Sequence, residues 1–324
     1  MYDVITIGSA TRDVFLVSDQ FKAIKTSLFE TGMAECMSLG SKIELKDQVL
    51  TTGGGGTNSA VTFASLGLRT ACICKVGEDA PGRDVLETLR LDGVKTTFVK
   101  QVQRGQTGYS TILTMKNGER TVLVHRGVSS KFTRADIPWK KLNAKWIYLT
   151  SLGGNFALSA EIIKKAKKNG CKIAWNPGTG ELKKGMRAFK ETLKFVDVFN
   201  INKEEAELLT KKTEAKEMLT KLQRENGITL ITDGVKGAYA HCCNKLYKIN
   251  TTRVNAVSQT GAGDAFGSAF VSALMLDHKI EEALSIGVLN AESVIQSFGA
   301  KIGILTKFPS KTALKKLKVT QIKM

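Results

Sequence analysis

The residue types best suited to chemistry in this chain of 324 residues lie in one run of small residues, Gln259-Thr260-Gly261-Ala262-Gly263-Asp264-Ala265-Phe266. Apolar residues recur at helical spacing from Ala265 to Leu276, so the run is expected to begin a buried helix. The first turn of a helix leaves about four N–H groups unpaired and has partial positive charge. The backbone amides of Gly261, Ala262 and Gly263 are therefore expected to bind an anion.

Asp264 lies in the same turn, next to the expected anion. Its carboxylate could accept a proton from an attacking hydroxyl, and base catalysis of this kind contributes about 100-fold to 10,000-fold in rate. The structural alternative is that Asp264 caps the helix and the glycines form a tight turn. For an isolated run this alternative is the more frequent one, so the interpretation depends on the rest of the chain.

A second glycine-rich run is Gly53-Gly54-Gly55-Gly56-Thr57-Asn58-Ser59-Ala60, which leads into a helical pattern at 61–67. Glycines let the backbone approach a ligand closely, and the Asn58 amide can both donate and accept hydrogen bonds. No lysine follows the glycines, so the run is not a phosphate loop of the GxxxxGK[ST] type. The alternative is a flexible loop tip.

Strand-like and helix-like segments alternate from about residue 144 onward. The expected strands cover 146–150, 172–175, 196–201 and 228–232, and the expected helices cover 158–169, 203–225 and 281–297. This alternation predicts an α/β fold with right-handed crossovers, in which a mostly parallel central sheet is flanked by helices on both faces.

The first 130 residues differ, because they contain segments that alternate polar and apolar residues. Tyr109–Met115 and Arg120–His125 flank Lys116-Asn117-Gly118-Glu119, and Asn-Gly supplies the positive φ angles of a tight hairpin turn. With strands from within 12–50, this hairpin is expected to form a small antiparallel sheet that projects from the main domain as a lid over a ligand cleft.

The composition is that of an ordinary soluble protein, with 42% hydrophobic and 24% charged residues. No apolar run reaches the roughly 18 residues of a membrane span, and the start of the chain does not resemble a signal peptide. Six cysteines without a CxxC pair, together with three histidines, predict neither a zinc site nor disulfides. Free thiols fit a cytoplasmic location.

The formal net charge of +18 would suit a polyanionic partner such as nucleic acid. The lysines, however, lie on helix faces and in the tail at 311–323, without interleaved aromatic residues. Solvated helix faces are the favoured interpretation, so neither a nucleic-acid nor a membrane partner is expected.

GGGGTNSA at 53–60 and TGAGDAFGSAF at 260–270 resemble the two signatures of the PfkB family of carbohydrate kinases, in the expected order and about 200 residues apart. The resemblance covers nearly the whole chain. It implies one ribokinase-like domain over 1–324, with a β lid formed from parts of 12–50 and 98–126. It further implies an ATP-dependent kinase, with Asp264 as general base and the amides of Gly261, Ala262 and Gly263 as an anion hole for the γ-phosphate.

The resemblance also implies roles for residues outside the second signature. The substrate sugar would contact Asp13, Gly53, Gly54 and Asn58. The nucleotide would contact Asn202, Thr232, Gly234 and Asn290. Glu205, in the N-x-x-E element that Asn202 begins, would organise Mg²⁺ through water.

The sequence leaves several alternatives open. Many relatives have an aspartate of a monovalent-cation site where this chain has Ser258, so activation by potassium is in doubt. Arg126 could meet an acidic sugar or a phosphate, or could form a structural salt bridge. Pairing of exposed strand edges would allow a homodimer through the lid.

Two other functions compete with the sugar kinase. A nucleoside kinase of adenosine-like substrates would have the same fold, and aromatic stacking in the lid would favour it. A non-catalytic binding protein of this fold would use the basic surface, but the intact Asp264 and its neighbouring amides argue against it.

Overall fold

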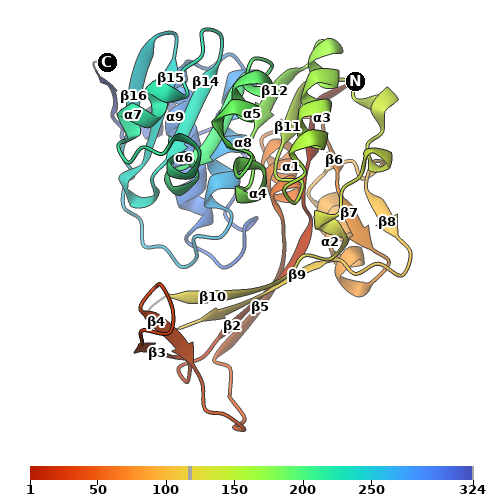
Figure 1. Cartoon of the computed structure of the whole chain (residues 1–324), viewed down its shortest axis with the longest axis vertical. Helices are drawn as coiled ribbons and strands as arrows, with labels where there is room; N and C mark the ends of the chain where they lie inside the picture. The colour runs from red at the N-terminus through yellow and green to blue at the C-terminus, as the bar shows by residue number, and fades with distance from the viewer. Residues whose placement is uncertain (116–118, 323–324) are drawn as a thin grey trace.

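The computed structural model describes residues 1–115 and 119–322. Its main body is a nine-stranded sheet with the strand order β17-β16-β15-β14-β13-β12-β11-β1-β6 (Figure 1). The strands of this sheet are β1 Tyr2–Ile7, β6 Thr70–Ile73, β11 Ala144–Leu149, β12 Lys172–Trp175, β13 Val198–Asn202, β14 Ile228–Thr232, β15 Ala238–Cys242, β16 Lys245–Ile249 and β17 Val319–Ile322.

The six strands from β6 to β14 pair in parallel, and β15, β16 and β17 continue the sheet antiparallel. Helices fill the crossovers between the parallel strands, as the alternating pattern requires. The predicted fold class, a mostly parallel central sheet flanked by helices with a small β lid, is confirmed.

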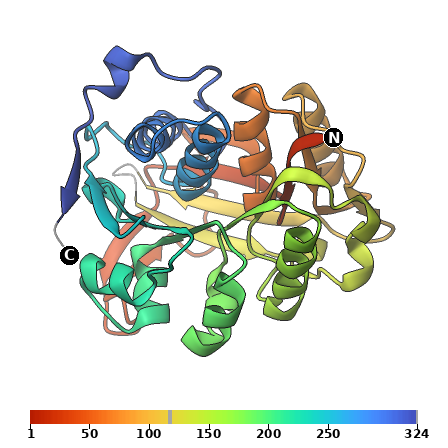
Figure 2. The same cartoon turned by 90° about the horizontal axis from the view of Figure 1, so that it is seen from above.

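Helices cover both faces of the main sheet, as the view from above shows (Figure 2). One face packs against α3 Phe156–Lys168, α4 Thr179–Leu182, α5 Gly185–Leu193, α6 Lys203–Thr210 and α7 Ala215–Lys221. The other face packs against α1 Gly55–Ser65, α8 Ala262–Met275, α9 Ile280–Val294 and α10 Lys311–Leu314. Successive strand residues point to opposite faces, so each strand contributes to the hydrophobic core on both sides of the sheet. Ile5 packs on the side of α3 to α7, and Val4 packs on the side of α1, α8, α9 and α10.

Within 1–115 and 119–322, no helix combines the length and the apolar character needed to cross a bilayer.

The lid is a four-stranded sheet with the order β10-β9-β2-β5, which extends below the main body in Figure 1. Its strands are β2 Thr11–Val17, β5 Asp47–Gly53, β9 Gly108–Thr114 and β10 Arg120–His125. The β9–β10 hairpin is antiparallel as predicted, while its expected Asn117-Gly118 turn lies outside the described residues. The expectation of a purely antiparallel lid is wrong, because β2 and β9 pair in parallel. β9 reaches the lid through a crossover that includes α2 Ala80–Leu91, so the direction of β9 is set by that connection rather than by a turn from β2.

Two smaller sheets accompany the lid. β3 Lys22–Lys25 and β4 Met33–Cys36 form a separate hairpin at its tip, within the segment 12–50. β7 Lys75–Gly77 and β8 Lys100–Val102 pair in parallel beside α2, so the segment 98–107 lies outside the four-stranded sheet.

The lid joins the main body without linkers. Only 8–10 separate β1 from β2, and β5 ends at Gly53, one residue before the N-cap of α1. The Ser129 hydroxyl, in the short helix η1 Gly127–Ser130 after β10, donates hydrogen bonds to the carbonyls of Ala10 and Lys75. The return strand of the lid is therefore fixed to the point where its first strand begins.

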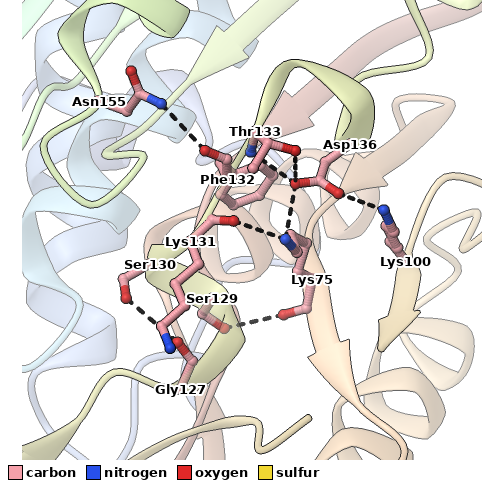
Figure 3. Close-up of polar contacts among 10 residues, drawn as sticks. All are labelled: Lys75, Lys100, Gly127, Ser129, Ser130, Lys131, Phe132, Thr133, Asp136 and Asn155. Atoms are coloured by element: carbon pink, nitrogen blue, oxygen red, sulfur yellow. Dashed lines mark hydrogen bonds and ion pairs between the residues drawn. The ribbon is translucent and has the colours of Figure 1, made fainter. Parts of the chain in front are cut away.

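A buried ion-pair cluster holds the segment that follows η1 (Figure 3). In the next short helix, η2 Arg134–Asp136, the carboxylate of Asp136 accepts hydrogen bonds from Lys75 Nζ at 2.8 Å and Lys100 Nζ at 2.6 Å. Burial raises the pKa of Asp136, but the bonds from Lys100, Lys75 and Thr133 outweigh it and hold the pKa well below its usual value. Lys75 also donates to the carbonyl of Lys131 at 2.7 Å.

Substitution Asp136→Asn is expected to destabilise the protein by about 3 kcal/mol, because it leaves the Lys75 ammonium enclosed without its counter-charge. The native carboxylate contributes stability above its unfolded pKa of 3.8 and loses it as the pH falls below that value. Urea unfolding between pH 3 and 7 measures both effects. The control Glu161→Gln removes the exposed pair of Arg134 and should cost less than about 1 kcal/mol. Equal costs for the two variants would contradict the assignment.

Candidate active site

The predicted small-residue run begins helix α8, as expected from the sequence. Gly261 is the N-cap residue, with φ 81° and ψ −1° in the left-handed region that favours glycine. A Cβ on Gly261 would lie 2.3 Å from Cβ of Ala300, so the close approach of the segment after α9 also requires glycine. The first turn of the helix, with the backbone N–H groups of Ala262 and Gly263, therefore lies at its open end, where Ala262 N also donates a hydrogen bond of 3.3 Å to the carbonyl of Gln259.

Asp264 lies in this first turn and contacts the second glycine-rich run. Asn58 Nδ2 donates a hydrogen bond of 2.9 Å to Asp264 Oδ2, which joins α1 to α8. Asp264 Oδ1 accepts no hydrogen bond from the residues that the structure describes. This oxygen faces Gly55, where a Cβ would lie 3.2 Å away. Burial raises the pKa of Asp264, and the Asn58 hydrogen bond and the charge of Lys301 oppose that rise.

Asp13 lies on the lid strand β2, opposite the first glycines. Its Oδ1 accepts a hydrogen bond of 3.0 Å from the Thr11 hydroxyl. A Cβ on Gly53 would lie 1.9 Å from Asp13 Oδ2, so the glycine leaves the room that this carboxylate occupies. Gly54 has φ 95°, and a Cβ there would lie 2.5 Å from the carbonyl oxygen of Ser9. The structure thus brings the four predicted sugar contacts, Asp13, Gly53, Gly54 and Asn58, to the root of the lid.

Asn202 and Glu205 form a capping box at the start of α6. Asn202 Oδ1 accepts from Glu205 N at 2.8 Å, and Glu205 Oε2 accepts from Asn202 N at 3.0 Å. Burial raises the pKa of Glu205 to about 7; the Asn202 bond opposes that rise, and the nearby carboxylates of Asp264, Glu204 and Glu181 add to it. Glu205, predicted to organise the metal ion, therefore lies near enough to Asp264 for the two carboxylates to interact electrostatically.

A cavity of about 340 Å³ adjoins the N-terminus of α8. Ala262 and Gly263 line it, and so do Asn202, Thr232 and Gly234, three of the four residues predicted to contact a nucleotide. Its apolar wall includes Phe266, Val288, Ala291 and Ile295.

The fourth predicted nucleotide contact, Asn290, does not line this cavity. It is fully buried, donates to the carbonyl of Ala265 at 2.9 Å and accepts from Leu305 N at 2.9 Å. Its side chain ties α9 to α8, and its neighbour Ala291 faces the cavity instead. Ser258 is buried and accepts from Thr260 N, while Arg126 is exposed and forms no ion pair with the described residues.

Lys301, which no sequence motif indicated, also ends beside this site. Its Nζ donates to Asn58 Oδ1 at 2.8 Å and to Thr57 Oγ1 at 3.0 Å. The one signal in the sequence is a lysine within the small and apolar segment Gly299-Ala300-Lys301-Ile302-Gly303. Such a lysine is expected to be enclosed and paired, but the sequence does not indicate its partner.

Together these elements place the N-terminus of α8, where an anion is predicted to bind, next to a carboxylate with one unbonded oxygen. The cavity lies on one side of that carboxylate, and the polar groups of the lid root lie on the other. The arrangement can therefore hold two molecules, one on each side of Asp264, and remove a proton from a hydroxyl between them.

The chain is similar in sequence to known proteins. A family model described as pfkB family carbohydrate kinase matches residues 1–307. The ribokinase of Haemophilus influenzae is 29% identical over 266 residues, which cover 79% of this chain and 84% of that protein.

Solved structures share the fold. The ribokinase of Arabidopsis thaliana, complexed with ribose and ATP, superposes with a TM-score of 0.74 at 22% identity, over 97% of this chain and 98% of that one. The nucleoside kinase of Burkholderia thailandensis, in complex with inosine, superposes with a TM-score of 0.75 at 17% identity, over 97% and 96% of the two chains.

Substitution Gly261→Ala is expected to destabilise the protein by about 2 kcal/mol or more, because alanine is strained at a left-handed N-cap and clashes with Ala300. The matched control is Gly263→Ala, where a Cβ meets nothing within 4 Å and should leave stability unchanged or raise it by up to about 1 kcal/mol. Thermal unfolding without ligand compares the two variants. If Gly261→Ala unfolds at the same temperature as the native chain, the close approach of α8 to Ala300 is wrong.

Proposed function

Because the chain belongs to the pfkB family of carbohydrate kinases and is an ATP-dependent sugar kinase, we propose that Asp264 is the general base of the phosphoryl transfer. The observation that supports this role is the free oxygen of its carboxylate, Oδ1, at the N-terminus of α8. Oδ2 is already held by Asn58 at 2.9 Å, so one oxygen is fixed and the other is available to the substrate.

In this mechanism Asp264 Oδ1 accepts the proton of the substrate hydroxyl as that oxygen bonds to the γ-phosphorus of ATP. The bond between the γ-phosphorus and the bridging β–γ oxygen breaks, and its electron pair leaves with ADP. The amides of Gly261, Ala262 and Gly263 stabilise the negative charge on the γ-phosphate oxygens through the partial positive charge of the helix start. The proton on Asp264 later returns to solvent.

The cavity beside α8 is proposed as the ATP site. Its apolar wall, with Phe266, Val288 and Ile295, suits a flat base, and Thr232 and Gly234 offer polar contacts at the opposite rim. Gly263 lines the same cavity at the helix start, so a nucleotide there would direct its phosphates toward Asp264.

Asn202 and Glu205 are proposed to hold Mg²⁺ through water. The described residues contain no cluster of three or more His, Cys, Asp or Glu side chains that could hold a metal ion directly. Glu205 nevertheless offers a hard oxygen ligand, Oε1, that accepts no bond from the described part of the chain. Mg²⁺ usually keeps several waters and takes its other ligands from substrate phosphates, so this donor set fits it. When bound, the ion would supply positive charge to the β- and γ-phosphates.

The sugar is proposed to bind at the lid root, against Asp13, Gly53, Gly54 and Asn58. A carboxylate can accept hydrogen bonds from two hydroxyl groups at once, which suits a polyol. The lid strands β2 and β5 would exclude water from the reacting groups and so limit wasteful hydrolysis of ATP.

A homodimer through the lid and a cytoplasmic location are further parts of this proposal. β10 and β5 are the edge strands of the lid, and β10 exposes Val122, Leu123 and Val124. All six cysteines are free thiols, which fits a reducing compartment.

Substitution Asp264→Asn is expected to lower kcat by at least about 100-fold, because the amide cannot accept the hydroxyl proton. ATP and sugar binding should remain, since the Asn58 amide can still pair with an amide oxygen. Isothermal titration with the nonhydrolysable nucleotide AMP-PNP checks binding, and coupled ADP release checks turnover. Near-native turnover in this variant would refute the general base.

The substrate class is tested with a panel of D-ribose, 2-deoxy-D-ribose, D-fructose, adenosine and inosine, measured by ADP release. We expect turnover of a free sugar, because the lid root offers carboxylate and amide groups for hydroxyls. Preference for adenosine or inosine would instead favour a nucleoside kinase. Absence of turnover with every member, combined with salt-dependent binding to RNA, would favour a non-catalytic protein.

A further inference from the structure

Lys301 belongs to the segment that follows α9, and its ammonium group ends under the N-terminus of α1. Three acceptors surround Nζ: the carbonyl oxygen of Thr52 at 2.7 Å, Thr57 Oγ1 at 3.0 Å and Asn58 Oδ1 at 2.8 Å. An ammonium group has three protons and no acceptor, so all its hydrogen-bonding capacity is used at this one place. The lysine is therefore fixed rather than free to reach solvent.

The bond to Lys301 determines which way the Asn58 amide faces. Because an ammonium group only donates, it must meet the carbonyl oxygen Oδ1 of Asn58 and not the amide nitrogen. The nitrogen Nδ2 consequently points the other way, where it donates to Asp264 Oδ2 at 2.9 Å. A rotated Asn58 would present an oxygen to the carboxylate and repel it. Lys301, Asn58 and Asp264 thus form a directed chain of hydrogen bonds.

The charges around this chain are mainly negative. Lys301 interacts electrostatically with Asp13 on β2, Asp264 on α8 and Asp92 after α2, and also with the thiols of Cys72 and Cys74 at the end of β6. Asp264 also interacts with Asp13, Tyr148 and Glu205. Burial lowers the pKa of Lys301 to about 8, and the surrounding carboxylates oppose that fall, so the ammonium remains protonated at neutral pH. Among the groups that act on Asp264, Lys301 supplies positive charge.

The same segment contacts both strands at the lid root. The Phe298 ring packs on Phe15 of β2 with centroids 5.3 Å apart. A Cβ on Gly299 would lie 3.0 Å from the Thr51 side chain of β5, and Lys301 bonds to the carbonyl of Thr52 in that strand. Lys301 therefore connects the base of the lid to the hydrogen-bond chain that ends at Asp264.

We propose that Lys301 is a positioning residue for phosphoryl transfer, which orients the Asn58 amide, places a positive charge near Asp264 and directs Asp264 Oδ1 toward the substrate. This inference rests on the proposed function, because it assigns Lys301 a role in the chemistry of Asp264. Lys301 acts through its neighbours and takes up no substrate proton itself.

Two variants distinguish the effect of Lys301 on the orientation of the Asn58 amide from the effect of its positive charge on Asp264. Lys301→Gln keeps an N–H donor for Asn58 Oδ1 but removes the charge, and Lys301→Met removes both. Loss of the charge raises the pKa of Asp264, so the acidic limb of the kcat profile should move to higher pH in both variants. A shift of about one pH unit corresponds to a tenfold loss of kcat below the limb. At pH values above the acidic limb and below the Lys301 pKa of about 8, the Gln variant should regain native kcat. The Met variant should remain about tenfold or more below it there, because its Asn58 is no longer oriented.

The readout uses the panel member that the native protein turns over fastest, with kcat and the KM for ATP measured from pH 5 to 9. The KM for ATP should stay within about twofold, because Lys301 lies outside the cavity beside α8. A second readout needs no turnover: the ¹³C carboxyl resonance of Asp264, assigned by its loss in Asp264→Asn, should titrate at higher pH in both variants.

Lys75→Met is the matched control. It removes another enclosed lysine, paired with Asp136 at 2.8 Å and part of the cluster of Figure 3 rather than of the Asp264 chain. This variant should lose stability but keep the native pH limb and the native Asp264 titration. Thermal unfolding shows which variants are folded at the assay temperature; if Lys301→Met is not, Lys301→Gln decides alone.

An unshifted acidic limb and an unshifted Asp264 resonance in Lys301→Gln would overturn the inference and leave Lys301 a structural residue. An equal shift in Lys75→Met would overturn it as well, since the effect would then follow from lost stability. Failure of the proposed function would give a different result, because the native protein would then turn over no member of the panel. The titration of the Asp264 resonance would still show whether Lys301 acts on Asp264.

Discussion

The hydrogen bond between Asn58 Nδ2 and Asp264 Oδ2 joins the first turns of two helices through residues that lie 206 positions apart in the sequence. Each helix begins with glycines because backbone comes too close for a side chain: Gly54 to Ser9, and Gly261 to Ala300. The bond fixes one carboxylate oxygen and leaves the other available. Burial raises the pKa of Asp264, and the Asn58 bond and the Lys301 charge oppose that rise. The surrounding fold holds these two side chains in contact.

Much of the fold could be predicted because hydrophobic periodicity and turn-forming residues depend only on neighbouring positions in the sequence. The strands at 172–175 and 228–232 have the predicted bounds, and α3 and α9 differ from prediction by a few residues. The long helix expected over 203–225 is two helices, α6 and α7, because Lys211 adopts the left-handed conformation with φ 58° and ends the first. Strand direction in the lid could not be predicted, because the crossover through α2 decides it and no residue in β2 or β9 does.

The residues of the candidate site could be predicted where they belong to a recognisable sequence motif. Asn58 bonds to Asp264, Gly55 lies beside the other oxygen of that carboxylate, and Thr232 and Gly234 line the cavity. Asn290 does not, because the packing of α9 on α8 turns its amide toward two backbone groups. Lys301 was missed for a related reason: its importance comes from three acceptors on β5 and α1, which are distant in sequence. Contacts between residues that are far apart in the sequence produce no periodic pattern in it.

The direct junctions between lid and main body have a mechanical consequence. Asp13 lies on β2, and the N-cap of α1 follows directly after β5. No flexible linker therefore separates the lid from Asp13 or from the start of α1. Opening it far enough to release a phosphorylated product must also withdraw Asp13 and disturb the start of α1. Departure of the product and displacement of Asp13 are then a single motion.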